Sequence, residues 1–226
     1  MQFPPRRALS PAKPRPAGRH HKVLHPWDYI YNLKIMRYGP DHKSKTRQRI
    51  VKSASKQFRA QGLSGPGVAR VMRASGLTVG GFYKHFRTRD DLVTEAIEEG
   101  LRDIRERLLG PVRQLPPGDA WKKIIANYLS IEHCEHADVG CPLAALAPEV
   151  SRTKPSVKKR IAGMLKQHRD EIMPFVPGNN AAEKEKNFIV TMSAMAGAIA
   201  FARTMQEPGD KQRILNTVRD YLLASF

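Results

Sequence analysis

Apolar residues recur at spacings of three and four along most of this chain, which is the period of an amphipathic α-helix. The first clear stripe is formed by Ile50, Ala54 and Phe58, and Gly62 follows it as a helix stop. A longer stripe runs from residue 93 to residue 108 and ends at a Gly-Pro pair. The alternation typical of β-strands is not sustained anywhere in the sequence. The pattern therefore predicts an all-α protein.

The same period continues with longer helices over residues 104–226. Four further apolar stripes follow one another, and Pro-Gly sequences mark several of the breaks between them; the stripes cover residues 121–129, 157–168, 188–199 and 214–222. We therefore expect a second, larger helical domain after the first.

A helix-turn-helix is predicted after the first stripe, over about residues 66–86. A short helix around Val71 is followed by a turn at Ser75-Gly76 and by a third short helix from Thr78 to about His85. We expect the glycine to supply the positive φ angle of the turn. The hydroxyl of Thr78 is expected to cap the third helix by accepting from a backbone N–H group.

Two consecutive glycines, Gly80 and Gly81, lie inside this third helix. Each costs about 1 kcal/mol relative to alanine, so their presence needs a reason. Either the missing side chains let the helix approach a DNA backbone closely, or they let it pack closely against the second helix. Both explanations can hold together.

The net charge of +18 is concentrated in the first part of the chain. Residues 1–91 contain twenty lysines and arginines against four acidic residues, whereas residues 92–226 contain nineteen against seventeen. Such asymmetry favours an N-terminal part that binds a polyanion and a C-terminal part that is an ordinary globular domain. A membrane surface would attract the same charge, so charge alone does not select DNA.

Residues 1–42 are predicted to be a disordered basic arm. Six prolines fall within the first 26 residues, and apolar periodicity is absent. The arm either follows DNA phosphates or has no role. It could also be translated upstream sequence, with Met36 as the true start.

Cysteine content and hydropathy indicate a protein of the cytoplasm. The chain has two cysteines, Cys134 and Cys141, which do not form a disulfide framework. The longest uncharged run, residues 187–202, falls short of the roughly 20 residues that a membrane helix needs. No secretory segment follows the start, and we expect no membrane partner.

Residues 76–86 resemble the recognition helix of the tetracycline-repressor (TetR) family; their sequence is G-L-T-V-G-G-F-Y-K-H-F. The resemblance covers residues 43–103 and departs from the family at Val79, where a basic residue is usual. It implies a DNA-binding domain over residues 43–103, and a helical domain over 104–226 that senses a ligand and forms a homodimer.

The resemblance also implies which residues contact double-stranded DNA. The expected contacts to the major groove and its flanking phosphates are Thr78, Val79, Gly80, Tyr83, Lys84 and His85. Two pairs at helix starts, Thr46-Arg47 and Thr88-Arg89, are expected to clamp phosphates. Because a dimer places two recognition helices about 34–36 Å apart, the operator is expected to be palindromic.

The predicted function is that of a transcriptional repressor, released from its operator by a small-molecule or electrophile inducer. The alternatives are an activator of the same fold and a basic protein that binds nucleic acid without sequence preference. The dinucleotide, phosphate-loop, nucleophile-elbow and zinc-protease motifs of enzymes are not found. We therefore expect no catalytic residues and no cofactor.

Small residues fill the helix predicted over 183–205, which permits close helix contact. With the helix over 210–225 it is expected to form half of an intersubunit four-helix bundle, although it could also be buried within one chain. The candidate ligand-binding residues are large and apolar or reactive, and each could instead belong to the core: Trp121, Tyr128, Cys141, Phe175, Phe188, Met192 and Phe201.

Cys141 stands between Gly140 and Pro142 at a predicted helix start, where a thiol pKa is lowered. It is either an electrophile sensor or a small buried residue at the helix entry. His133, Cys134, His136 and Cys141 could together bind zinc, but their spacing matches no known zinc module, and we expect no metal.

Overall fold

The computed structural model describes residues 40–225 of the chain. Most of the predicted arm over residues 1–42, with Met36, lies outside the described residues. Residues 40–42 belong to helix α2 (Pro40–Gln61) rather than to the arm. Proline suits a first helical position because it has no N–H group to leave unpaired there, and the carboxylate of Asp41 favours a helix start.

The first half of the described chain consists of α2, α3 (Val68–Ala74), the short 3₁₀ helix η1 (Val79–Lys84) and the long α4 (Arg89–Leu109). Helices α3 and η1 are the predicted helix-turn-helix, so that prediction is confirmed in position. The third helix differs in type, because it is a 3₁₀ helix and not an α-helix. Two consecutive glycines, Gly80 and Gly81, disfavour a regular α-helix here.

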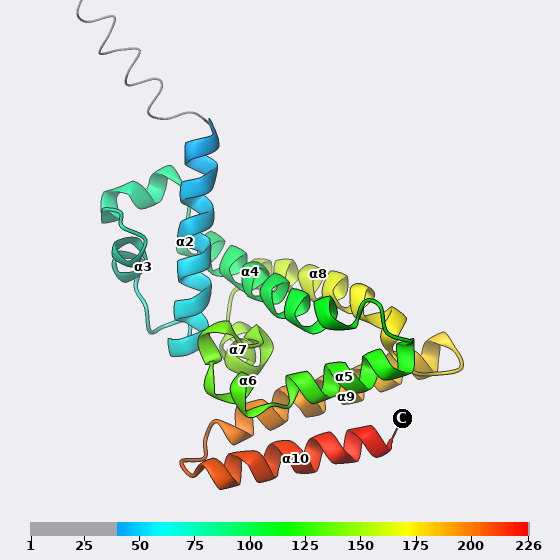
Figure 1. The fold of residues 1–226 in the computed structure, drawn as a ribbon. Coiled ribbons are helices and arrows are strands. Elements are labelled where there is room, and N and C mark those ends of the chain that lie inside the picture. Colours follow the sequence, from blue (N-terminus) through cyan, green and yellow to red (C-terminus); the bar gives the residue numbers. More distant parts are fainter. Residues whose placement is uncertain (1–39, 226) are drawn as a thin grey trace, which may run out of the picture. The chain divides into compact units, whose positions relative to one another are not determined.

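The second half is a set of helices joined by short turns (Figure 1). The elements are η2 (Gly110–Val112), α5 (Pro117–Tyr128), α6 (Ile131–Glu135), η3 (Ala137–Val139), α7 (Pro142–Ser151), α8 (Pro155–Ile172), η4 (Met173–Phe175), α9 (Ala181–Ala202) and α10 (Pro208–Ala224). Helices α4 and α8 lie side by side, as do α9 and α10. No strand occurs in residues 40–225, and the all-α prediction is confirmed.

Two hydrophobic cores divide this part of the molecule along α4. One gathers around Ile50, Phe58 and Leu101, and the other begins at Ile104 and is centred on α5 and α9. The predicted domain boundary at residues 103–104 therefore falls inside a continuous helix. Both cores therefore include residues of α4. None of the helices that the structure describes is long and apolar enough to cross a membrane.

Candidate nucleic-acid interface

The turn of the helix-turn-helix depends on Gly76, whose φ angle is +69°. This is the left-handed region that glycine adopts at no steric cost, as the sequence predicted. Ser75, the residue before it, is buried, and its hydroxyl donates to the carbonyl oxygen of Val71 at 2.9 Å. The turn is thereby fixed to the end of α3.

Thr78 has extended backbone angles at the N-cap position of η1, but its hydroxyl caps nothing. The prediction of a side-chain cap is therefore wrong. The first turn of η1 is closed instead by the N–H of Gly81, which donates to the Thr78 carbonyl oxygen at 3.1 Å. Because the tighter 3₁₀ turn already uses this N–H group, the exposed hydroxyl of Thr78 remains available to another partner.

The side chains of η1 divide into a buried and an exposed set. Phe82 and Phe86 are each 2% exposed, and their rings stack with centroids 5.4 Å apart. On the other side, Tyr83 is 78% exposed, Val79 is 45% exposed and Lys84 is also exposed. The two buried phenylalanines pack η1 against the core and thereby fix the position of the exposed side chains.

The two glycines of η1 are not explained by packing. A β-carbon added to Gly80 would meet no atom within 4 Å, and one added to Gly81 would lie 3.7 Å from the methyl group of Met72, an ordinary contact. The structure therefore does not support close packing against α3 as the reason for Gly80. Close approach of another molecule to the outer face is the explanation that remains.

Thr46 and Arg47, predicted to lie at the start of the first helix, lie in the second turn of α2 instead. Thr46 is 7% exposed. Arg47 pairs with Glu95 of α4 and donates to the carbonyl oxygen of His85, and its guanidinium lies 4.3 Å from the centroid of the Phe86 ring. In this structure Arg47 links the end of η1 to α2 and α4, and its predicted contact with a phosphate stays a prediction.

The carboxylate of Asp91 lies at the start of α4, where the phosphate contact was predicted. Thr88 and Asp91 form a capping box, in which the Thr88 hydroxyl accepts from the Asp91 N–H at 3.1 Å and donates to the Asp91 carboxylate at 2.9 Å. This hydrogen bond lowers the pKa of Asp91, with further help from Arg160. A phosphate at this helix end would meet the charges of Asp90 and Asp91, so the geometry argues against the predicted clamp at Thr88.

Arg89 and His85 are also tied to the protein. Arg89 donates to the carbonyl oxygen of Leu63 and lies 5.7 Å from the centroid of the Phe58 ring. His85 is half-buried, and burial lowers its pKa, as do the charges of Lys43, Arg47 and Lys84. Arg89 therefore links the start of α4 to the end of α2 and the turn after it.

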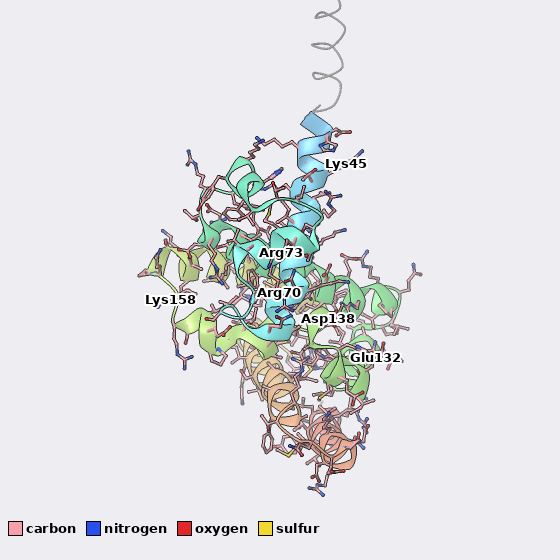
Figure 2. The ribbon with its side chains drawn as sticks, turned by 90° about the vertical axis from the view of Figure 1, so that its left-hand side faces the viewer. Lys45, Arg70, Arg73, Glu132, Asp138 and Lys158 are labelled. Carbon is pink, nitrogen blue, oxygen red and sulfur yellow. The ribbon has the colours of Figure 1, made fainter. Side chains whose placement is uncertain are left out.

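Two basic residues of α3 were missed in the sequence. Arg70 and Arg73 are exposed, and Figure 2 shows them next to each other on the side of the molecule that faces the viewer. In a helix-turn-helix the first of the two helices crosses the DNA backbone. The signal that could have found them is their spacing of three, which places both on one face of the short helix.

Comparison with known proteins supports the same region. The family of bacterial regulatory proteins called the tetR family matches residues 50–96. The chain is 26% identical over 108 residues to the HTH-type transcriptional regulator LmrA of Bacillus subtilis (strain 168), which corresponds to 47% of this chain and 57% of LmrA. The chain thus matches little more than half the length of this curated relative.

Solved structures share the fold over most of the chain. A TetR-family regulator from Cytophaga hutchinsonii has a TM-score of 0.67 at 17% identity, covering 84% of this chain and 98% of its own. A TetR regulator from Chloroflexus aurantiacus J-10-FL has a TM-score of 0.66 at 21% identity, covering 80% and 96%. The regulator FadR from Bacillus subtilis, in complex with stearoyl-CoA, has a TM-score of 0.58 at 13% identity, covering 79% and 98%. Residues 50–96 of this chain therefore match the tetR family, and the chain shares the fold of the solved TetR-family regulators.

Most of the ligand-binding residues predicted from the sequence are core residues. Trp121, Tyr128 and Cys141 are each 1% exposed, and Met192 is buried with them. Phe175 and Phe188 are half-buried against the same core. Phe201 is 57% exposed, so its placement in an internal pocket is wrong. It lies two residues beyond the buried Ile199, about 200° around the helix, and therefore points outward.

Cys141 is the N-cap residue of α7, and burial closes it to solvent. Its backbone N–H donates to Nε2 of His133 at 2.9 Å, and Nδ1 of His133 lies 2.7 Å from the carbonyl oxygen of Tyr128. These bonds support the alternative of a small buried residue at the helix entry over that of an electrophile sensor. They also occupy both ring nitrogens of His133. Within residues 40–225, no group of three or more His, Cys, Asp or Glu side chains is arranged to hold a metal ion.

Helices α9 and α10 expose a face of large apolar and small side chains. On α9, Ile189 is 53% exposed, Val190 is 50% exposed and Phe201 is 57% exposed, while Tyr221 on α10 is 73% exposed. Between the large residues of α9 lie exposed small ones, Ser193, Gly197 and Ala200. We call these seven residues the α9–α10 face. Exposed apolar residues gathered in this way mark an interaction surface.

Proposed function

We propose that this chain is a sequence-specific transcriptional repressor that binds a palindromic operator as a homodimer. The observation that supports it best is the outer face of η1, where Val79, Gly80, Tyr83 and Lys84 are exposed on a helix held rigidly by two buried phenylalanines. Such a helix can enter a major groove and offer hydroxyl, ammonium and methyl groups to the bases. Its place of action is the cytoplasm, where bacterial DNA lies.

Phosphate contacts would come from the basic side chains around that face. Arg70 and Arg73 on α3 and Tyr83 on η1 are exposed, and α3 packs against η1. Phosphate contacts fix the position of a protein on DNA, and base contacts specify the sequence. This division replaces the clamp that the sequence predicted at Arg47 and Thr88.

Dimerisation is proposed through the α9–α10 face. Two copies of this face, one on each protomer, would form a four-helix bundle, in which Ser193, Gly197 and Ala200 allow the α9 helices to approach closely. The same arrangement sets two copies of η1 at a fixed separation, which a palindromic operator requires. The helical domain would then also bind an inducer, as its relative FadR holds stearoyl-CoA.

The test is a titration of operator DNA with variants of the η1 face. Tyr83→Ala and Lys84→Ala each remove a contact to DNA and leave the two buried phenylalanines in place. We expect each to weaken operator binding at least tenfold, because a charge-assisted hydrogen bond contributes about 1.5–3 kcal/mol. The measurement is fluorescence anisotropy at fixed salt.

The matched control is Lys122→Ala, which removes an exposed lysine of α5 far along the chain from η1. It should bind operator as the wild type does, and all variants should remain dimeric by light scattering. Wild-type affinity in both η1 variants would contradict the proposed interface. Equal weakening on operator and random DNA would identify binding without sequence preference.

A further inference from the structure

A groove of about 410 Å³ opens between α4, α5 and α6. Its walls include Ile104, Arg107 and Leu108 from α4, Asn127 from α5, and His133 and His136 at the end of α6. We call it the α4–α6 groove. Its volume lies in the range of small-molecule sites, and none of the ligand-binding residues predicted from the sequence lines it.

The α4–α6 groove combines an apolar floor with a cationic wall. Ile104 and Leu108 are buried at 4% and 3% exposure. Arg107 is exposed, and no carboxylate of residues 40–225 pairs with it, because the neighbouring acids Asp103 and Glu106 pair with Arg59 and Arg113. A half-apolar ligand with one acidic group would satisfy both surfaces at once.

The charge around His133 favours an anion further. Burial lowers the pKa of His133 to about 4, and the positive charges of Arg203 and Arg107 lower it too. Glu132 also lines the groove, but its side chain is exposed, so water screens it. The neutral ring of His133 therefore lies among cationic groups.

His133 connects the groove to the DNA-binding domain. Its Nε2 accepts from the N–H of Cys141, and the preceding residue, Gly140, offers its carbonyl oxygen to Arg59 of α2 at 3.0 Å. Arg59 is 3% exposed and also pairs with Asp103 of α4 at 3.1 Å. A ligand that displaces the His133 ring must therefore disturb the anchor of the helix that supports the helix-turn-helix.

Gly140 has no room to absorb such a displacement. A β-carbon at this position would lie 2.8 Å from Nη2 of Arg203 and 3.0 Å from the His133 ring. Arg203, the C-cap residue of α9, donates to the carbonyl oxygens of Cys134 and His133 at 2.8 and 2.9 Å. The turn at Gly140 is thus packed between His133, Arg203 and Arg59, and a shift of one moves the others.

We infer that the α4–α6 groove binds a small amphipathic organic acid, with its carboxylate on Arg107, and that its occupancy is passed through His133 and Gly140 to Arg59 and the DNA-binding domain. This inference rests on the proposed function only for its second half. The ligand site itself is defined by the groove and its chemistry.

The binding half is tested by isothermal calorimetry with decanoate as the probe and decylammonium as its cationic counterpart. We expect saturable decanoate binding, with decylammonium at least tenfold weaker. Arg107→Gln should weaken decanoate about tenfold, because it removes one charge-assisted hydrogen bond. Lys122→Gln removes the charge of an exposed lysine that does not line the groove, so it is the matched control and should bind as the wild type does. Absence of saturable decanoate binding, equal binding of the two probes or an unaffected Arg107→Gln would overturn the site.

The relay half is tested by operator titration with and without decanoate. In the wild type, decanoate should lower operator affinity at least about fivefold. Arg59→Lys keeps a cation beside Asp103 but loses the bond to Gly140, so it should bind decanoate normally and release operator less. His133→Phe, which retains the ring but neither hydrogen bond, is the second variant if Arg59→Lys proves misfolded by circular dichroism. A full decanoate response in a folded variant would overturn the relay.

The two proposals fail separately. If the wild type binds no operator at all, the proposed function fails, and calorimetry still decides whether the groove binds the acid. If operator binds but decanoate binds without releasing it, the relay fails and the site stands.

Discussion

Val79 brings a branched apolar side chain to the outer face of η1, at a position where the resembling family usually has a basic residue. It is 45% exposed. In a major groove, the group that suits an apolar side chain is the 5-methyl group of thymine. Val79 is therefore expected to read one thymine of the operator.

The Val79 prediction is tested by replacing single thymines of the operator with deoxyuridine, which lacks that methyl group. The wild type should lose about fourfold in affinity at one position of each half-site, because a buried methyl group contributes about 0.8 kcal/mol. Val79→Ala should bind both DNAs alike. Indifference of the wild type to every such replacement would show that Val79 reads no methyl group.

A substitution at Gly80 is expected to affect DNA binding without destabilising the fold. Because a β-carbon at this position meets no atom within 4 Å, Gly80→Ala should leave the free energy of unfolding unchanged or raised by up to about 1 kcal/mol. The added methyl group should hinder close approach of η1 to DNA and weaken operator binding at least tenfold. Urea unfolding and anisotropy measure the two effects, and a stable variant with normal operator affinity would contradict the explanation.

At the residue scale, sequence predicted conformation better than partners. Gly76 had to adopt a positive φ angle, because its place between two helices leaves few other turns. The partners of Arg47 and Thr88 depend on Glu95, Phe86 and Asp91, which only the packed domain brings into position. A basic or capping residue at a helix start can serve a phosphate or its own protein, and its type does not decide between them.

At the element scale, α9 shows how helical period assigns faces. The stripe of Met192, Met195 and Ile199 was expected to be buried, and it is. The helix end was placed within three residues of Ala202. Phe201 was assigned to the interior by its size, whereas the period of 3.6 residues directs it outward with Ser193 and Gly197. The helical period is therefore a better guide to the burial of Phe201 than the size of its side chain.

The α9–α10 face gives a prediction at this scale. Phe201→Glu places a charge on a proposed apolar interface, so it should shift the protein from dimer to monomer at micromolar concentration. Since Phe201 is 57% exposed in one chain, the fold itself should tolerate the change. Sedimentation velocity measures the mass, and circular dichroism checks the fold.

The control for this variant is Leu115→Glu, which changes another large exposed apolar residue, 40% exposed, outside α9 and α10. It should remain dimeric. If Phe201→Glu also sediments as the wild type does, the dimer is held by another surface. A monomeric wild type would argue against the palindromic operator as well.

At the scale of the whole molecule, the half-buried His133 and the buried His168 make stability depend on pH. Burial lowers the pKa of His133 and of His168 to about 4, and nearby arginines, Arg105 in the case of His168, lower them further. Between pH 6.5 and pH 4 the unfolded chain therefore binds protons that the folded chain does not. The free energy of unfolding must fall as pH falls through this window.

Between pH 7 and pH 5, the loss is about 2 kcal/mol for each histidine. His168→Leu should remove the part of this loss in the free energy of unfolding that His168 causes. Leucine suits the site, because Nδ1 of His168 has no hydrogen-bond partner within residues 40–225 and leucine leaves no polar atom unpaired there. Urea unfolding at the two pH values measures it. The matched change at the exposed His136 should leave the dependence as in the wild type, and equal slopes in all three proteins would contradict the assignment.

The whole architecture followed from the sequence more readily than its ligand site did. Apolar periods predicted the helices and the division into two domains, because each helix must bury its own stripe. The α4–α6 groove could not be predicted, because it depends on gaps between Ile104, Asn127 and His133, which come from three different helices. The relay from His133 to Arg59 likewise joins positions far apart in the chain.

The central claim is that η1 of a dimer recognises a palindromic DNA sequence. Its most direct test is selection of binding sites by the full chain from random-sequence DNA, followed by footprinting of the enriched sites. The account predicts an inverted repeat whose half-sites are protected about 34–36 Å apart or a multiple of that distance, and no enrichment by Tyr83→Ala. Enrichment of no sequence, or of a site without a repeat, would contradict it.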